Sequence, residues 1–362
     1  MLYTNAEVFN TGLRRFEKGG FYVKDDRFAD PASAPADEPV TDLGGKKVIP
    51  GLIDIHTHGA MGEDLSECSY EGLVKMAKYY ADNGIAFFCP ANLTVPYEQL
   101  ERAYANALRL TKEKPEGCAE IAGINMEGPY FSEKRKGSQN AKYLKKPDYE
   151  GFKKLYDGCE GLIRICDVAP ELPGAEEFIS MVSKLCTVSV AHTDATYEEA
   201  AAGFDAGATH LTHLFNAMPA LHHRNPGVIA AAAERENVHV ELICDGLHVH
   251  PAMVRLAFRL FGPDRICIIS DSLCCCGMPD GVYGHGGQDI ILKDNIARLR
   301  DGTIAGSASN VKQEVLNCVE FGIPLEDAVI AATLTPAKAI GMENEIGSID
   351  IGKKAAFTVL DI

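Results

Sequence analysis

Six side chains that can bind a metal ion follow short apolar segments of the chain. Each segment has the composition of a β-strand, and imidazole and carboxylate groups suit a borderline divalent cation such as zinc or iron. In a β/α barrel the carboxyl ends of the strands meet on one rim, so side chains placed there can share an ion. No redox-cofactor motif accompanies them, which favours a metal that activates water for hydrolysis. The six residues are His56, His58, Glu127, His192, His213 and Asp271.

The strands that must position these side chains alternate with amphipathic helical segments. This alternation is typical of repeated βα units around a buried parallel sheet. Eight such units predict an α/β fold, a metal-dependent (β/α)8 TIM-like barrel with its active site at the carboxyl ends of the strands. The strand candidates span residues 51–56, 85–89, 120–127, 162–169, 187–192, 208–213, 238–244 and 265–271.

Both ends of the chain have a different pattern. The first forty-odd residues hold short β-like runs, and the segment IGSIDIGKKAAFTVLDI at the end alternates apolar and polar residues. We expect residues 1–49 and 336–362 to form one small flanking β-sandwich domain, and residues 50–335 to form the barrel. Between strand eight and the end, a Gly-rich hairpin or loop is followed by two predicted helices, over 311–321 and 325–334.

Composition limits the classes of partner. The 362 residues are 46% hydrophobic and 24% charged, as in an ordinary globular protein. A formal net charge of -16 argues against a nucleic-acid or anionic-membrane partner. No apolar run approaches a membrane span, and Met1 to Asn10 lack the pattern of a signal peptide. The twelve cysteines form no paired CxxC motifs. Free buried thiols and a cytoplasmic location are therefore expected.

The segment PGLIDIHTHG strengthens the metal hypothesis, because an HxH at a strand end presents both imidazoles to one side. It resembles the PG-[FL]-[IV]-D-x-H-x-H segment on the first strand of the amidohydrolase superfamily. The segment LTPAKAIGMENEIGSIDIGKKAAFTVLD resembles the superfamily's C-terminal signature, with Ala356 where an Asp is usual. That departure falls in the small sheet domain and bears little on the chemistry.

Within this superfamily, the chain resembles the N-acetylglucosamine-6-phosphate deacetylase family over nearly its whole length. Seven segments occur in the same order as in that family: NMEGPYFS, KGSQNA, AHTDAT, THLFNAMPALHHRNPG, ICDGLHVHP, ISDSLCCCGMPDG and AGSASN. The resemblance implies hydrolysis of N-acetyl-D-glucosamine 6-phosphate to D-glucosamine 6-phosphate and acetate, in amino-sugar catabolism.

The resemblance also implies roles for the candidate ligands. Glu127 corresponds to the anchor ligand of the metal site, with His192 and His213 as its imidazole partners. His56 and His58 resemble the ligands of a second metal position, so one or two divalent ions per subunit, zinc or iron, are expected.

The catalytic and substrate-binding roles follow in the same way. Asp271 resembles the catalytic carboxylate, and His248 resembles the residue that contacts the reacting carbonyl and the ring hydroxyls. The family's phosphate and sugar contacts correspond to Asn216, Ala217 and Arg224, and His223 beside Arg224 could join them. The family's loop around Arg224 suggests a contact with a neighbouring subunit, and hence a homodimer.

Two other interpretations stay open at this point. One is another amidohydrolase activity, such as a deaminase or a cyclic-amide hydrolase. Several of those enzymes use a modified Lys at the end of strand four, whereas strand four here ends CDVAPE. The other is a non-catalytic barrel used as a binding module, although no candidate ligand is missing. His210, His239, His250 and His285 are interpreted as ordinary hydrogen-bonded residues, and Cys274, Cys275 and Cys276 as loop packing.

Overall fold

A run of parallel strands forms the body of the protein in the computed structural model, which describes residues 1–67 and 69–360, except for the side chain of His285. Hydrogen-bonded neighbours follow chain order in two sets, β6-β9-β10 and β11-β12-β13-β14-β15-β16. All eight predicted strands are present, and the predicted strand 120–127 is divided into two. The strands are β6 (Leu52–Thr57), β9 (Ile85–Pro90), β10 (Glu120–Ile121), β11 (Ile124–Tyr130), β12 (Ile163–Val168), β13 (Thr187–Val190), β14 (His210–Leu211), β15 (His239–Ile243) and β16 (Ile266–Ile269).

Two contacts connect these sets of strands. Ala91, just after β9, forms a parallel bridge with Asn125 of β11. At the other side, the backbone N–H of Asp271 donates to the carbonyl oxygen of His56 over 2.9 Å. The first and last parallel strands are therefore neighbours at their carboxyl ends.

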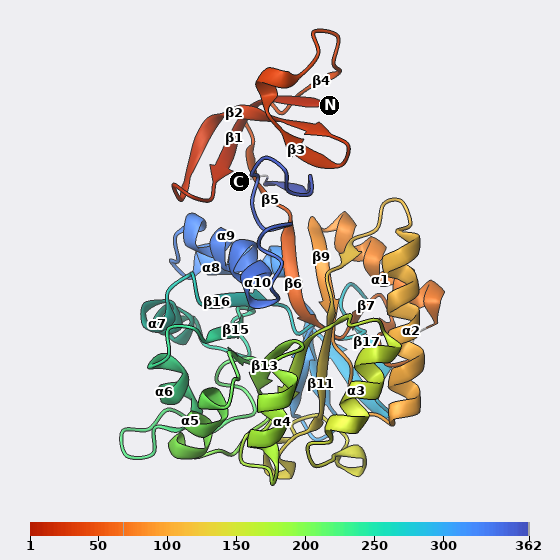
Figure 1. The fold of residues 1–362 in the computed structure, drawn as a ribbon, viewed down its shortest axis with the longest axis vertical. Helices are drawn as coiled ribbons and strands as arrows, with labels where there is room; N and C mark the ends of the chain where they lie inside the picture. Colours follow the sequence, from red (N-terminus) through yellow and green to blue (C-terminus); the bar gives the residue numbers. More distant parts are fainter. Residues whose placement is uncertain (68, 361–362) are drawn as a thin grey trace.

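Helices lie between the strands and pack on their outer side (Figure 1). The local sequence explains where they begin and end. Thr196 and Glu199 form a reciprocal capping box at the start of α5 (Tyr197–Asp205). Gly84, at φ +77°, supplies the left-handed residue just beyond α1 (Tyr70–Asp82). The others are α2 (Tyr97–Glu113), α3 (Tyr149–Gly158), α4 (Ala175–Val182), α6 (Gly227–Ala233), α7 (Pro251–Phe261), α8 (Val311–Glu320), α9 (Leu325–Ala332) and α10 (Leu334–Ala339).

The two ends of the chain meet in one sheet, which stands at one end of the molecule (Figure 1). Its strand order is β21-β5-β1-β2-β3, and β4 also pairs with β1. The strands expected to form a β-sandwich are thus hydrogen-bonded as a single six-stranded sheet. They are β1 (Leu2–Asn10), β2 (Arg15–Lys24), β3 (Arg27–Ala29), β4 (Val40–Asp42), β5 (Lys47–Pro50) and β21 (Phe357–Leu360).

The Gly-rich segment after β16 is more ordered than its sequence indicated. It forms an antiparallel sheet of β17 (Gly281–His285), β18 (Gln288–Lys293), β19 (Ile296–Leu299) and β20 (Ile304–Ser307). The backbone N–H of Ser307 donates to the carbonyl oxygen of Asp271 over 2.8 Å. This contact fixes the end of β20 directly beside the end of β16.

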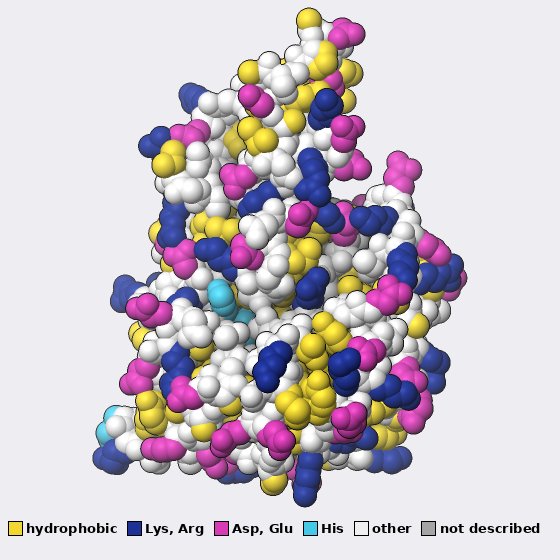
Figure 2. Space-filling view, in the orientation of Figure 1, with side chains coloured by type: hydrophobic (Ala, Val, Ile, Leu, Met, Phe, Trp, Pro, Cys, Tyr) yellow, Lys and Arg dark blue, Asp and Glu magenta, His cyan; other side chains and the backbone are white. Residues whose placement is uncertain are grey.

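The surface carries charges of both signs. On the face viewed in Figure 2, Lys and Arg are interspersed with Asp and Glu, and no broad area of one sign appears. Among the described residues, no helix is long and apolar enough to cross a bilayer.

Candidate metal centre

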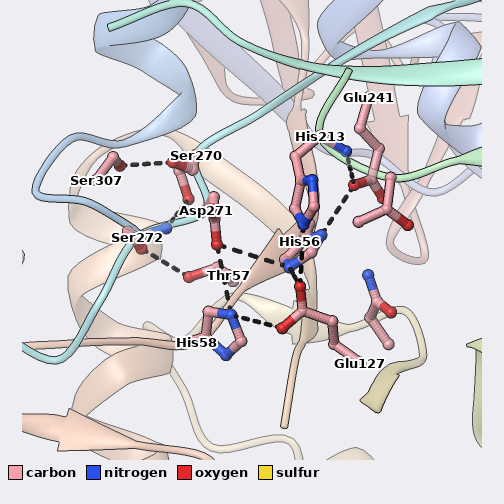
Figure 3. Close-up of polar contacts among 12 residues, drawn as sticks. His56, Thr57, His58, Glu127, His213, Glu241, Ser270, Asp271, Ser272 and Ser307 are labelled. Carbon is pink, nitrogen blue, oxygen red and sulfur yellow. Dashed lines mark hydrogen bonds and ion pairs between the residues drawn. The ribbon is translucent and has the colours of Figure 1, made fainter. Parts of the chain in front are cut away.

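The six predicted ligands converge at the carboxyl ends of the parallel strands. His56 belongs to β6 and Glu127 to β11, and the other four directly follow or lie near the ends of β6, β13, β14 and β16. All six are buried, with at most 9% of their surface exposed. Figure 3 shows His56, His58, His213, Glu127 and Asp271 pointing toward one another. The strand pattern of the sequence therefore predicts the common location of these side chains correctly.

The first group of donor atoms surrounds one oxygen of Glu127. Oε1 of Glu127 lies 3.1 Å from Nε2 of His192 and 3.3 Å from Nε2 of His213. The two imidazole nitrogens are themselves 3.1 Å apart. Ligands about 2.0–2.1 Å from a tetrahedral zinc ion lie roughly 3.3 Å from one another, so the spacing fits a shared ion.

The second group is His56, His58 and Asp271. Oδ1 of Asp271 lies 3.4 Å from Nε2 of His58 and 3.6 Å from Nε2 of His56. That nitrogen of His56 is buried and has no hydrogen-bond partner within the described structure. Oε2 of Glu127 lies 3.2 Å from Nε2 of His58 and Oε1 lies 3.5 Å from Nε2 of His56, so this carboxylate contacts both groups. A carboxylate in this position can bridge two ions.

Three of the residues adopt a backbone conformation that L-residues rarely use. The φ angles of His192, His213 and Asp271 are +44°, +29° and +47°. Such angles are costly and persist where surrounding contacts impose them, commonly at functional sites. All three lie two residues beyond the end of a parallel strand, β13, β14 or β16.

The buried charges hold one another in their ionised forms. Burial raises the pKa of Asp271, but the hydrogen bond from His58 and the charge of His56 outweigh burial, and the pKa is lowered. Burial likewise opposes ionisation of Glu241, and the charge of His56 with hydrogen bonds from His210 and His56 lowers its pKa to about 2. Asp271 is therefore a carboxylate that can accept a proton.

A cavity of about 240 Å³ opens onto these groups. Of the predicted substrate-binding residues, His248, Asn216 and Ala217 line it. Arg224 and His223 do not line it, and both are exposed. A larger groove of about 720 Å³ lies near Glu120 and Lys354 and contains none of the predicted site residues.

Several residues at the site were not identified from the sequence. Nε2 of Gln139 donates to Oε2 of Glu127 over 2.6 Å. Nδ1 of His248 lies 2.6 Å from Oδ2 of Asp245. Burial lowers the pKa of His248, but the hydrogen bond and charge of Asp245 outweigh burial, so the pKa is raised. Oε2 of Glu241 lies 2.8 Å from Nδ1 of His56. A charged residue inside the apolar run VHVELIC was the available signal for Glu241. Gly137, Ser138, Thr303, Ile304 and Ala305 also line the cavity.

The histidines and cysteines given ordinary roles have ordinary contacts. His250 caps the first turn of α7 through the backbone N–H of Ala252. The side chain of His285 lies outside the described part of the chain. The thiols of Cys274 and Cys276 donate to the carbonyl oxygens of Gly284 and Ser309, as expected for loop packing. His210 differs from the others, because its ring contacts the same carboxylate, that of Glu241, as the ring of His56.

Residues 47–362 match the model of the Amidohydrolase family. The chain belongs to the amidohydrolase family. It is 33% identical over 320 residues to the N-acetylglucosamine-6-phosphate deacetylase of Vibrio furnissii, covering 88% of this chain and 80% of that protein. It is 33% identical over 364 residues to the Bacillus subtilis enzyme of the same name, covering 99% and 91%. It is also 32% identical over 340 residues to the N-acetylgalactosamine-6-phosphate deacetylase of Escherichia coli O157:H7, covering 92% and 90%.

Solved structures give the same result. A mutant of the N-acetyl-D-glucosamine-6-phosphate deacetylase of Mycobacterium smegmatis, in complex with N-acetyl-D-glucosamine-6-phosphate, superposes with a TM-score of 0.92 at 32% identity. The match covers 100% of this chain and 95% of that one. The enzyme of Pasteurella multocida has a TM-score of 0.92 at 28% identity, covering 99% and 94%.

Proposed function

We propose that this protein is a metal-dependent hydrolase that converts N-acetyl-D-glucosamine 6-phosphate to D-glucosamine 6-phosphate and acetate in amino-sugar catabolism. The observation that carries the proposal is the meeting of Glu127, His192, His213 and Asp271 at one cavity, in a chain similar over its full length to deacetylases of this substrate. The named relatives act on phosphorylated N-acetyl amino sugars, which favours this activity over a deaminase or a cyclic-amide hydrolase. A non-catalytic barrel would not need all of these metal-binding and catalytic side chains.

The donor set suits a divalent ion, zinc or iron. Glu127, His192 and His213 would hold one ion, and His56 and His58 with Asp271 would hold a second. A bound ion of this kind lowers the pKa of water from 15.7 to about 7 and polarises a carbonyl oxygen.

Asp271 and His248 carry the proton transfers and the charge of the reaction. The Asp271 carboxylate accepts a proton from the attacking water and returns it to the departing nitrogen, which makes the amine a better leaving group. The ring of His248, held by Asp245 at 2.6 Å, donates toward the acetamide oxygen as negative charge develops there. Both side chains line the same cavity, as this division of roles requires.

Recognition of the sugar phosphate is divided between two subunits in this proposal. Asn216 and Ala217 line the cavity of their own subunit, whereas Arg224 and His223 are exposed on a loop between β14 and α6. Leu221, in the same loop, is also 47% exposed. A homodimer in which this loop enters the partner's cavity accounts for both facts, and it supplies a cation for the 6-phosphate in a chain of net charge -16.

The finer architecture is part of the same proposal. The Ala91–Asn125 bridge and the hydrogen bond between Asp271 and His56 support a closed (β/α)8 barrel over residues 50–335. The shared sheet of β1–β5 and β21 supports one small β domain formed by residues 1–49 and 336–362. We also propose a cytoplasmic location, which fits eleven described cysteines that are all free.

Acetate release tests the function. Purified protein should release acetate from N-acetyl-D-glucosamine 6-phosphate, and much more slowly from N-acetylglucosamine without phosphate. N-acetyl-D-galactosamine 6-phosphate is the informative third substrate, because one relative is a deacetylase of that sugar. A higher kcat/KM on the galacto epimer would change the assigned substrate. Release from none of the three by metal-loaded protein would refute the proposal.

A further inference from the structure

Glu241 is a fully buried carboxylate that the proposed reaction does not use. It lies in the middle of β15, none of its surface is exposed, and it does not line the cavity. A buried carboxylate is costly unless its oxygens are hydrogen-bonded. Its partners therefore show why it is there, and all three of them are histidines.

Both oxygens of Glu241 face nitrogen atoms. Oε2 lies 2.8 Å from Nδ1 of His56 and 3.1 Å from the backbone N of His213. Oε1 lies 3.1 Å from Nε2 of His210. Figure 3 shows Glu241 beside His56 and His213.

This contact fixes which nitrogen of His56 carries hydrogen. An ionised carboxylate can only accept, so Nδ1 of His56 must be the N–H that donates to it. The lone pair of a neutral ring is then on Nε2, which lies 3.5 Å from Glu127 and 3.6 Å from Asp271. Without an acceptor at Nδ1, the ring could hold its hydrogen on Nε2 and lose its ability to bind a metal there.

The same oxygen also supports the other group of ligands. The backbone N–H that it accepts belongs to His213, which is held at φ +29°. One oxygen of Glu241 thus contacts a ligand from each group, one through its ring and one through its backbone. The ring contact determines ligand chemistry, whereas the backbone contact determines only position.

We propose that Glu241 is the positioning residue that sets the tautomer of His56, and that the second metal position, formed by His56, His58 and Asp271, depends on it. The inference rests on the metal centre of the proposed function. Removing the acceptor should weaken binding at the second position selectively. Loss of an outer hydrogen-bond partner typically costs about 10–100-fold in metal affinity.

Two substitutions of Glu241 separate tautomer control from general damage. Glu241→Leu removes the acceptor. Glu241→Gln retains one acceptor oxygen, and its orientation is determined by His213, because a backbone N–H can only donate and so requires that oxygen at the Oε2 position. The amide NH2 then faces Nε2 of His210, whose ring can carry its hydrogen on Nδ1 instead. Glu241→Gln should therefore preserve His56 and change the tautomer of His210.

Asp167→Leu is the matched control. Asp167 is another fully buried acidic residue, on strand β12 of the same sheet, and it accepts from the hydroxyl of Thr212 rather than from a metal ligand. His58→Ala serves to identify the second position, because it removes a ligand without touching Glu241. Each variant is made in the full-length chain.

The experiment titrates zinc into each protein in competition with a chelator and resolves the two affinities. We expect Glu241→Leu to weaken zinc affinity at the second position, the one that His58→Ala abolishes, by about 10–100-fold. Glu241→Gln and Asp167→Leu should change that affinity by less than about 3-fold. Long-range ¹H–¹⁵N correlation of ¹⁵N-histidine protein should show Nδ1–H on His56 in the wild type and in Glu241→Gln. An unchanged second affinity in Glu241→Leu, equal losses in Asp167→Leu, no second ion in the wild type, or an Nε2–H tautomer of His56 would each overturn the inference. Acetate release by the wild type is scored separately, so failure of the proposed function is distinguishable.

Discussion

Arg224 offers the most decisive test of how the substrate is held. The side chain is exposed in the monomer and lines no part of its own cavity. Replacing an exposed arginine should change the free energy of unfolding by no more than about 0.5 kcal/mol. In a dimer, the same side chain would be a desolvated partner of the 6-phosphate, and its loss should cost about 2–4 kcal/mol, or roughly 30- to 1,000-fold in kcat/KM.

Complementation then shows which subunit supplies the arginine. Arg224→Ala and Asp271→Asn should each lower kcat/KM strongly on their own. If Arg224 acts in the partner's site, a mixed dimer of the two variants contains one site with both defects and one site with none. Random re-association of equal amounts makes about half of the dimers mixed, so about a quarter of wild-type activity should return.

The assay is acetate release after the two variants are dissociated, mixed and re-associated, with each variant alone as the control. The preference of Arg224→Ala for phosphorylated over unphosphorylated sugar is measured in parallel and should collapse. No recovery on mixing, in dimers shown by native mass spectrometry to be mixed, would place Arg224 in its own subunit or outside the site. Equal loss on both sugars would give Arg224 a structural role.

Three further predictions follow from individual groups. Asp271→Asn should fold and bind substrate but lose about 10²–10⁴-fold in kcat, and retention of more than about a tenth would exclude Asp271 as the base. Asp245→Asn removes the carboxylate that raises the pKa of His248 against burial, so the high-pH limb of the kcat/KM profile should move to lower pH. If the limb stays where it is, His248 is not the group that titrates there. Burial, with the nearby charge of His210 as the next cause, lowers the pKa of His239 to about 4, so stability present above about pH 6.5 is lost as the pH falls toward 4. When the pH is lowered from about 7.5 to 5, the free energy of unfolding of His239→Gln should fall by about 1–2 kcal/mol less than that of the wild type. Chemical denaturation at both pH values measures this, and equal decreases would contradict it.

Much of the site followed from the sequence because it depends on position along strands. Strand periodicity placed Glu127, His192 and His213 at one rim, and the structure brings them within 3.3 Å of one another. The same argument placed Asp271, since the last strand lies beside the first in the structure.

What the sequence did not provide depends on contacts between distant segments. Gln139 reaches Glu127 from a loop, and Glu241 reaches His56 across 185 residues, so neither had a spacing to reveal it. Of the sheet β17–β20, the sequence predicted only a Gly-rich hairpin or loop, because the strands are short and their pairing is determined by hairpin contacts. The outward position of Arg224 could not follow from one chain's pattern, because its proposed partner is another chain.

The central claim is that Glu127, His192 and His213 hold the ion on which deacetylation depends. The direct measurement is the rate of acetate release from N-acetyl-D-glucosamine 6-phosphate as metal-free protein is titrated with zinc or ferrous iron, with bound metal determined in the same samples. The account predicts that activity rises in proportion to the first ion bound, and that Glu127→Gln lacks both that ion and turnover. Full turnover by metal-free protein, or a Glu127→Gln variant with normal metal content and normal rate, would contradict it.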